Sequence, residues 1–187
     1  PKTIPKQTAL IIVDMQNAFV EEGAGIEVRG IRKNLPNFKK FIKFCREKNI
    51  LIIYTRHCYT PEANPVEAKL FPELKKEWLK SGTHGWQIYN PLCPENSDFI
   101  IDKARYDAFF QTPLHELLQK KNIKNIIITG TMTEICCEST ARSAMYYNYN
   151  ILFCSDLTFT SDPQRQAITL SIIKSHFGIA ASSKEVC

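Results

Sequence analysis

Short apolar runs alternate along the chain with longer stretches that mix apolar and polar residues. The runs are rich in Ile, Val, Leu and Phe, and near-continuous apolar runs are typical of strands that are covered on both faces. The pattern predicts strands over residues 8–14, 50–55, 98–102, 124–130, 150–156 and, more weakly, 177–181.

Between these runs, apolar residues recur at helical spacing, as Phe38, Phe41 and Cys45 do on one stripe. Asp162 followed by Pro163 is a helix-start signal, because aspartate caps a helix and proline fits its first position. The pattern predicts helices over residues 35–49, 112–122, 134–148 and 161–177.

This order of strands and helices predicts a parallel sheet with helices on both faces. No repeat or low-complexity segment divides the chain, so we expect one Rossmann-like, three-layer α/β/α domain over residues 1–187. A long irregular region from about residue 57 to 97 contains five prolines. We expect it to hold a short helix around residues 71–80 and part of a substrate lid.

Residues whose side chains can act as an acid, a base or a nucleophile follow three of the predicted strands. The first strand ends at Asp14, the third at Lys103, and the fourth at Gly130, whose loop leads to Cys136. Ligands bind beyond the carboxyl ends of the strands in an open parallel sheet. A carboxylate, an ammonium and a thiol are therefore predicted at one edge.

Each of these residues also has a structural explanation. Asp14 could cap the turn after its strand, Lys103 could lie at the surface, and Cys136 could be a small buried helix residue. The functional explanation gains weight because all three are predicted at the same edge.

The three groups together suit acyl transfer through a thioester. The first turn of a helix and a nearby ammonium favour a thiolate, and a carboxylate can accept the thiol proton. Backbone N–H groups of the loop can bind the oxyanion of a tetrahedral intermediate.

The net charge and the length of the apolar runs argue against two classes of partner, nucleic acids and membranes. The net charge of +5 is mild, and the lysine clusters at residues 39–48, 75–80 and 120–124 have the helical spacing of solvated helix faces. A nucleic-acid surface is usually a more strongly basic stripe. No apolar run approaches the roughly 20 residues that span a bilayer. We expect neither a nucleic-acid nor a membrane partner.

The cysteine pattern indicates the compartment. The seven cysteines show no CxxC motif and no repeated spacing, which favours a reducing, cytoplasmic setting over a disulfide scaffold. The first residues show no basic flank before a long apolar region, so we expect no signal peptide.

Four segments resemble those of the isochorismatase-like cysteine hydrolases. They are "ALIIVDMQNAFV" (9–20), "GTHGWQIYNPLCP" (82–94), "IIDKARYDAFFQTPL" (100–114) and "ITGTMTEICCESTARSAMYYNY" (128–149). The resemblance spans nearly the whole chain and implies a six-stranded parallel sheet in the order 3-2-1-4-5-6. It implies a catalytic triad of Asp14, Lys103 and Cys136, with Cys137 as a buried structural neighbour.

The resemblance also implies a cis peptide bond between Thr131 and Met132. The N–H groups of Met132 and Cys136 would then form the oxyanion hole.

Candidate substrate-binding residues follow from their positions in these segments and in the irregular region. Any one aromatic is more often a core residue than a substrate contact, and the arginine could hold a substrate carboxylate or only pair with a helix. The candidates are Phe19, Arg56, His57, Trp86, Tyr106 and Phe109.

The sequence departs from the metal-dependent nicotinamidases of this family, which carry an Asp and His cluster after the second strand. His57 and Tyr59 stand near those positions, and the four histidines form no ligand-spaced pair. We therefore expect no metal and no other cofactor. Cys136 disfavours the isochorismatase reaction, because the relatives that hydrolyse that vinyl ether lack the cysteine.

The remaining relatives cleave C–N bonds, so we expect a cysteine hydrolase that uses water on a small amide, carbamoyl or ureido substrate. "KARYDAFFQTPL" and "CCEST" look closest to the ureidoacrylate amidohydrolase branch. A metal-dependent nicotinamidase, an isochorismatase-type hydrolase and a catalytically idle binding or scaffold relative remain alternatives. The family often forms dimers or tetramers, which implies a homo-oligomer.

Overall fold

The fold is described by a computed structural model that covers residues 5–60, 62–72 and 78–186. The strands are β1 Thr8–Val13, β2 Leu51–His57, β3 Phe99–Lys103, β4 Asn125–Thr131, β5 Asn150–Phe159 and β6 Ile179–Ala181. The helices are α1 Asn17–Val20, α2 Ile31–Glu47, α3 Pro65–Leu70, α4 Leu114–Lys120, α5 Glu138–Tyr146, α6 Pro163–Ile172 and α7 Ser183–Val186. Other helical turns are η2 Asn90–Leu92, η3 Thr133–Cys137 and η4 Ile173–Phe177.

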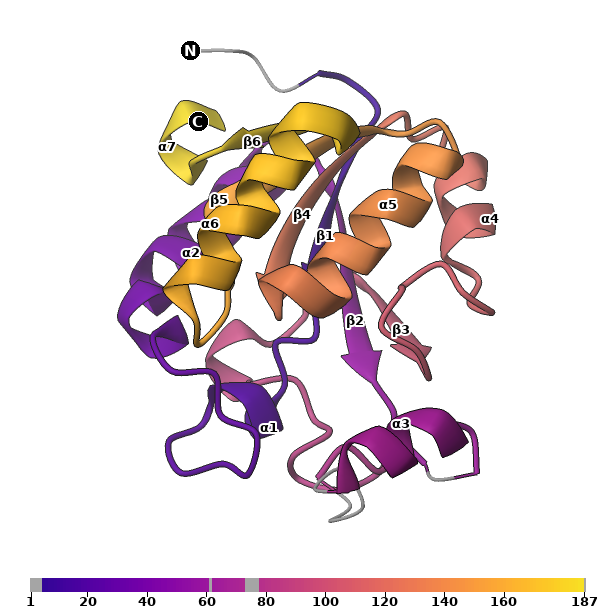
Figure 1. Cartoon of the computed structure of the whole chain (residues 1–187). Helices are drawn as coiled ribbons and strands as arrows, with labels where there is room; N and C mark the ends of the chain where they lie inside the picture. The colour runs from indigo at the N-terminus through magenta and orange to yellow at the C-terminus, as the bar shows by residue number, and fades with distance from the viewer. Residues whose placement is uncertain (1–4, 61, 73–77, 187) are drawn as a thin grey trace.

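The six strands form one sheet in the order β3-β2-β1-β4-β5-β6, and every pair is parallel. The predicted fold class and strand order are confirmed. β1 lies at the centre of the sheet, and all six of its residues are buried. The carboxyl ends of the strands point toward α1 and α3 (Figure 1). This edge is therefore the one at which a ligand is expected.

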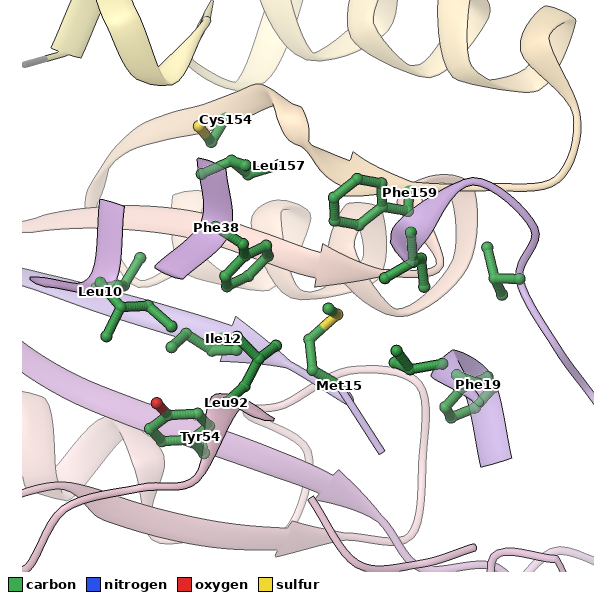
Figure 2. Close-up of a cluster of buried hydrophobic side chains, with 14 of the residues drawn as sticks. Leu10, Ile12, Met15, Phe19, Phe38, Tyr54, Leu92, Cys154, Leu157 and Phe159 are labelled. Carbon is green, nitrogen blue, oxygen red and sulfur yellow. The ribbon is translucent and has the colours of Figure 1, made fainter. Parts of the chain in front are cut away.

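Helices cover both faces of the sheet and enclose two hydrophobic cores. On one face, α2 packs Phe38 and Phe41 against Leu10 and Ile12 of β1, and Figure 2 shows part of this cluster. On the other face, α4 and α5 pack against the alternate residues of β1, such as Ile11. Burial of each large apolar side chain stabilises the fold by about 1.5–3 kcal/mol. The two cores therefore hold the helices firmly against both faces of the sheet.

Two helix starts differ in how well the sequence predicted them. Asp162 caps α6 as expected, because its side chain accepts hydrogen bonds from the N–H groups of Gln164 and Arg165. α2 begins at Ile31 rather than at residue 35 and runs through Pro36. Ile31 is buried, so extending the apolar stripe by one turn outweighs the hydrogen bond that Pro36 cannot make.

The side chain of Gln16, in the loop after β1, links this loop to the end of β2 and to the long region that follows it. Gln16 Nε2 donates to the carbonyls of His57 at 3.0 Å and Trp86 at 2.8 Å, and Gln16 Oε1 accepts from the N–H of His57 at 2.8 Å. The helix expected around residues 71–80 includes residues 73–77, which lie outside the described residues. Among the described residues, no helix combines the length and apolar character needed to cross a bilayer.

Gly130 illustrates how closely β1 and β4 approach at the functional edge. It pairs with Val13, has φ +113°, and an added Cβ would lie 2.0 Å from the carbonyl oxygen of Val13. We expect Gly130→Ala to lower the free energy of unfolding by at least about 2 kcal/mol, because both strain and a backbone clash oppose it.

Urea unfolding measures this cost, with Gly23→Ala as the matched control. Gly23 also has a positive φ, +74°, but nothing lies within 4 Å of an added Cβ. The control should cost only the strain of about 1 kcal/mol. Equal costs at the two positions would contradict the close approach.

Candidate active site

Asp14 leaves β1 in a conformation that turns its side chain toward β2. Its backbone is left-handed, with φ 50°, and its side chain is fully buried. Asp14 Oδ1 accepts a hydrogen bond from Thr55 Oγ1 at 2.7 Å. Val13 already faces the α4 and α5 side, so regular strand alternation would have sent Asp14 to the opposite face.

Lys103 lies at the end of the edge strand β3, with β2 between it and β1. Its long stem nevertheless brings Nζ to 2.7 Å from Asp14 Oδ2, and both side chains are 0% exposed. Nζ also donates to the carbonyl of Arg105 at 3.0 Å. An ion pair with no solvent access depends on such additional hydrogen bonds, because desolvation of each charge is costly.

Cys136 lies in a π-helical turn that follows β4. The peptide bond between Thr131 and Met132 is cis. The N–H groups of Ile135 and Cys137 then both donate to the carbonyl of Met132, at 3.2 and 3.1 Å. This π-helical turn, η3, holds Cys136, whereas the sequence predicted it in the first turn of the α-helix; α5 begins only at Glu138.

The electrostatics of Cys136 favour a protonated sulfur at rest. Burial raises the pKa of the Cys136 thiol well above its ordinary value, and the Asp14 carboxylate raises it further. Lys103 and a hydrogen bond from the Met132 backbone oppose this rise without overcoming it. Burial thus outweighs the effect of the nearby ammonium, which by itself favours a thiolate.

Lys103 itself stays charged. Burial is the largest single effect and would lower its pKa, but the Asp14 carboxylate and the adjacent Cys136 sulfur together raise the pKa of Lys103 above its ordinary value. The resting site is thus an ion pair beside a neutral thiol, whose sulfur lies within 4.8 Å of a carboxylate oxygen of Asp14. This arrangement can pass the thiol proton directly to the carboxylate.

His57 joins these three residues at the end of β2. One of its ring nitrogens, a carboxylate oxygen of Asp14 and Cys136 Sγ all lie within 4.8 Å of one another. Burial and the nearby Lys103 lower the pKa of His57 to about 3, so the ring is neutral at physiological pH. Its Nε2 is buried without a hydrogen-bond partner, and the ring of Tyr106 lies 5.9 Å away.

The spacing of Asp14, His57 and Cys136 would also suit a metal ion by distance alone. The Asp14 carboxylate, however, already binds the Lys103 ammonium and the Thr55 hydroxyl, each at 2.7 Å. A cation at this point would face a buried positive charge across a few ångströms, where repulsion is strong. The donor set fits proton transfer better than metal binding.

Phe19 and Phe109, two of the predicted substrate contacts, have packing roles in the structure. Phe19 is buried in the hydrophobic cluster on the α2 side, near Met15 (Figure 2). The ring of Phe109 packs against those of Tyr147 and Tyr149, with centroids 5.4 and 5.9 Å apart.

Arg56 and Trp86 are not brought together with the triad. Arg56 lies between Thr55 and His57 on β2, so strand alternation points it to the other face. Its Nε and one terminal nitrogen bind both carboxylate oxygens of Asp102, at 2.7 and 2.9 Å. The guanidinium also stacks over the Trp86 ring at 3.7 Å. Arg56 thus pairs with a strand residue, neither with a helix nor with the triad.

Sequence reasoning missed Thr55 and Gln16, which position Asp14 and His57. The period-two pattern of β2 could have indicated Thr55, since it shares a face with His57. No local signal indicates Gln16, whose partners are 41 and 70 residues away along the chain. Cys137 is fully buried, as the sequence predicted.

Comparison with known proteins places this geometry in a family. The sequence matches the isochorismatase domain over residues 8–185. The chain belongs to the isochorismatase family. Members of this family are hydrolases, and the chain is accordingly an isochorismatase-like hydrolase.

Two individual relatives are similar to this chain over nearly its whole length. The ureidoacrylate amidohydrolase RutB of Enterobacter sp. (strain 638) is 31% identical, over 98% of this chain and 89% of that protein. A cysteine hydrolase from Pseudomonas syringae pv. phaseolicola 1448A superposes with a TM-score of 0.90 at 26% identity, over 96% of this chain and 90% of the other.

A third comparison concerns a zinc-containing relative. The pyrazinamidase of Pyrococcus horikoshii in complex with zinc has a TM-score of 0.83 at 25% identity, over 94% of this chain and 99% of the other. The fold is thus shared with a pyrazinamidase that binds zinc.

The low pKa of His57 predicts a specific pH dependence of stability. The unfolded ring takes up a proton near pH 6.5 but the folded ring only near pH 3, so the unfolded state binds more protons between these values. Stability is therefore lost as the pH falls from 6.5 toward 3, by up to about 1.4 kcal/mol per pH unit from this residue.

Chemical denaturation of the wild type and of His57→Asn at pH 4.5, 5.5 and 6.5 measures this contribution. The variant should show a shallower fall of the unfolding free energy with decreasing pH. The exposed His176 offers a control, since His176→Asn should leave the slope unchanged. An identical slope in wild type and His57→Asn would show that the ring is not held neutral.

Proposed function

We propose that the protein is a cysteine amidohydrolase that cleaves a C–N bond of a small amide, carbamoyl or ureido compound through a thioester. The observation that carries this proposal is the buried contact of Asp14 with Lys103 at 2.7 Å, beside the Cys136 thiol. The named activities of the relatives, ureidoacrylate amidohydrolase and cysteine hydrolase, support the same class of reaction.

In the first half-reaction, Asp14 accepts the proton of the Cys136 thiol as the sulfur attacks the substrate carbonyl. The N–H groups of Met132 and Cys136 stabilise the resulting oxyanion. When the C–N bond breaks, Asp14 returns the proton to the departing nitrogen. An acyl group then remains on the sulfur as a thioester.

In the second half-reaction, a water molecule attacks the thioester carbonyl and gives a proton to Asp14. The C–S bond breaks, the acid product leaves, and Asp14 protonates the sulfur again. Lys103 remains charged throughout, because its raised pKa keeps the ammonium beside the carboxylate. Its role is to hold Asp14 in place and to stabilise the transient thiolate.

His57 and Tyr106 are the predicted substrate contacts that remain beside the sulfur. The low pKa of His57 keeps its ring neutral, and burial, with Glu67 nearby, raises the pKa of Tyr106 to about 12. Both side chains can therefore exchange hydrogen bonds with a neutral amide without adding charge. The unpartnered Nε2 of His57 is an atom that such a substrate would satisfy.

The same proposal includes the cellular setting and assembly. We place the enzyme in the cytoplasm as a homo-oligomer that needs water but no cofactor, metal, nucleic acid or membrane. The described cysteines are all free, in keeping with a reducing compartment. Exposed apolar side chains such as Tyr146 and Ile168 offer surface for contacts between subunits.

Two adjacent cysteines allow a matched test of the nucleophile. Cys136→Ala should lower the turnover rate by at least about a thousandfold, because no other group can form the thioester. Cys137→Ala should keep most of the activity, because Cys137 is buried and its sulfur faces the carbonyl of Thr129 at 3.9 Å.

Ammonia release from a panel of small primary amides and ureido acids provides the measurement. Wild type and both variants are compared on each compound that the wild type hydrolyses. Retained activity in Cys136→Ala would contradict the mechanism, as would a loss confined to Cys137→Ala.

A further inference from the structure

Arg105 is a charged residue next to the triad that the mechanism does not use. It follows Lys103 by two positions, and its carbonyl accepts a hydrogen bond from Lys103 Nζ at 3.0 Å. Its guanidinium is one of the charges that lower the pKa of His57. The Arg105 backbone is therefore fixed to the reacting groups, while its side chain, 37% exposed, reaches solvent.

The guanidinium of Arg105 makes only weak polar contacts with the described residues. Its NH1 donates to the neighbouring carbonyl of Ala104 at 3.2 Å, and its ion-pair contact, with Glu67, is at 4.0 Å. Five other arginines each hold a carboxylate oxygen at 2.5 to 3.3 Å: Arg32, Arg46, Arg56, Arg142 and Arg165. Within the part of the chain that the structure describes, Arg105 therefore retains donors for the carboxylate of a ligand.

Glu67 holds Arg105 only loosely because it is engaged elsewhere. The side chain of Asn64 donates both to Glu67 and to the carbonyl of Ala104, which ties α3 to the loop that carries Arg105. Glu67 is thereby kept near the guanidinium but outside the usual range of a hydrogen bond. A ligand carboxylate of better geometry would replace this weak contact.

The charge balance of the site explains why such a group is needed. Asp14 and Lys103 neutralise each other, and His57 is uncharged. A substrate that carries a carboxylate would bring an unpaired negative charge to a buried site, which is costly. Arg56, the arginine that the sequence suggested for this purpose, is already bound to Asp102.

We propose that Arg105 forms an anion subsite that binds the carboxylate of a ureido or carbamoyl acid while the carbamoyl carbon lies at Cys136. The substrate class is thus a small molecule with an uncharged amide-type end and an anionic end. This inference rests on the proposed function for the placement of the carbamoyl end. Arg105 acts here as a specificity-determining residue and takes no part in bond breaking.

Binding to a background without the nucleophile tests the subsite apart from turnover. Calorimetry on Cys136→Ala should detect ureidoacrylate, and adding Arg105→Gln should weaken its Kd by about tenfold to a hundredfold. Propylurea, which lacks the carboxylate, should bind both forms within about twofold of each other, since its contacts do not involve the charge. Arg105→Lys should restore part of the affinity for ureidoacrylate.

Two further variants separate the subsite from a structural effect. Glu67→Gln should tighten the binding of ureidoacrylate, because it frees the guanidinium, so substitutions at 67 and 105 act in opposite directions. Arg29→Gln removes the same charge from an exposed position and should change neither Kd. In the active enzyme, Arg105→Gln should raise KM for ureidoacrylate more than it lowers kcat.

The outcomes distinguish this inference from the proposed function. If Arg105→Gln weakens both compounds equally, or weakens neither, the anion subsite is wrong. The subsite is also wrong if ureidoacrylate does not bind to Cys136→Ala. If binding depends on Arg105 but wild type releases no ammonia from either compound, the subsite stands and the proposed hydrolysis of ureido acids falls.

Discussion

The contact between Asp14 and Lys103 is the interaction on which the site depends. Both side chains are completely buried and 2.7 Å apart, although their strands are separated by β2. A charge without solvent is tolerated only with a close partner of opposite sign, so neither residue can be replaced alone at low cost. The sheet order, the left-handed turn at Asp14 and the hydrogen bond from Thr55 all serve to bring this pair together.

The pair also resolves a conflict at Cys136. A buried sulfur resists ionisation, which protects it from side reactions but makes it a weak nucleophile. In the proposed mechanism, the adjacent Asp14 carboxylate removes the proton at the moment of attack, and Lys103 stabilises the sulfur anion. Under this proposal the thiolate forms only at the moment of attack, and the neutral ring of His57 adds polarity without competing for the proton.

Most of the sheet and the three central residues could be predicted from the sequence, because apolar runs define parallel strands and parallel strands share one functional edge. Which face a neighbouring side chain occupies was harder to predict. Period-two alternation places Arg56 on the opposite face from His57, whereas packing with distant tyrosines decides the position of Phe109. The π-helical turn around Cys136 and the weak pairing of Arg105 depend on contacts that no local pattern encodes.

The central claim is that Asp14, Lys103 and Cys136 act as one unit that forms a thioester. Rapid-quench mass spectrometry during turnover of a confirmed amide or ureido substrate tests it directly. The account predicts an acyl group on the peptide that contains Cys136 in the wild type, and no such adduct in Asp14→Asn or Lys103→Met. Product formation by the wild type with no acyl adduct on Cys136 at any quench time, or undiminished adduct in Asp14→Asn, would contradict it.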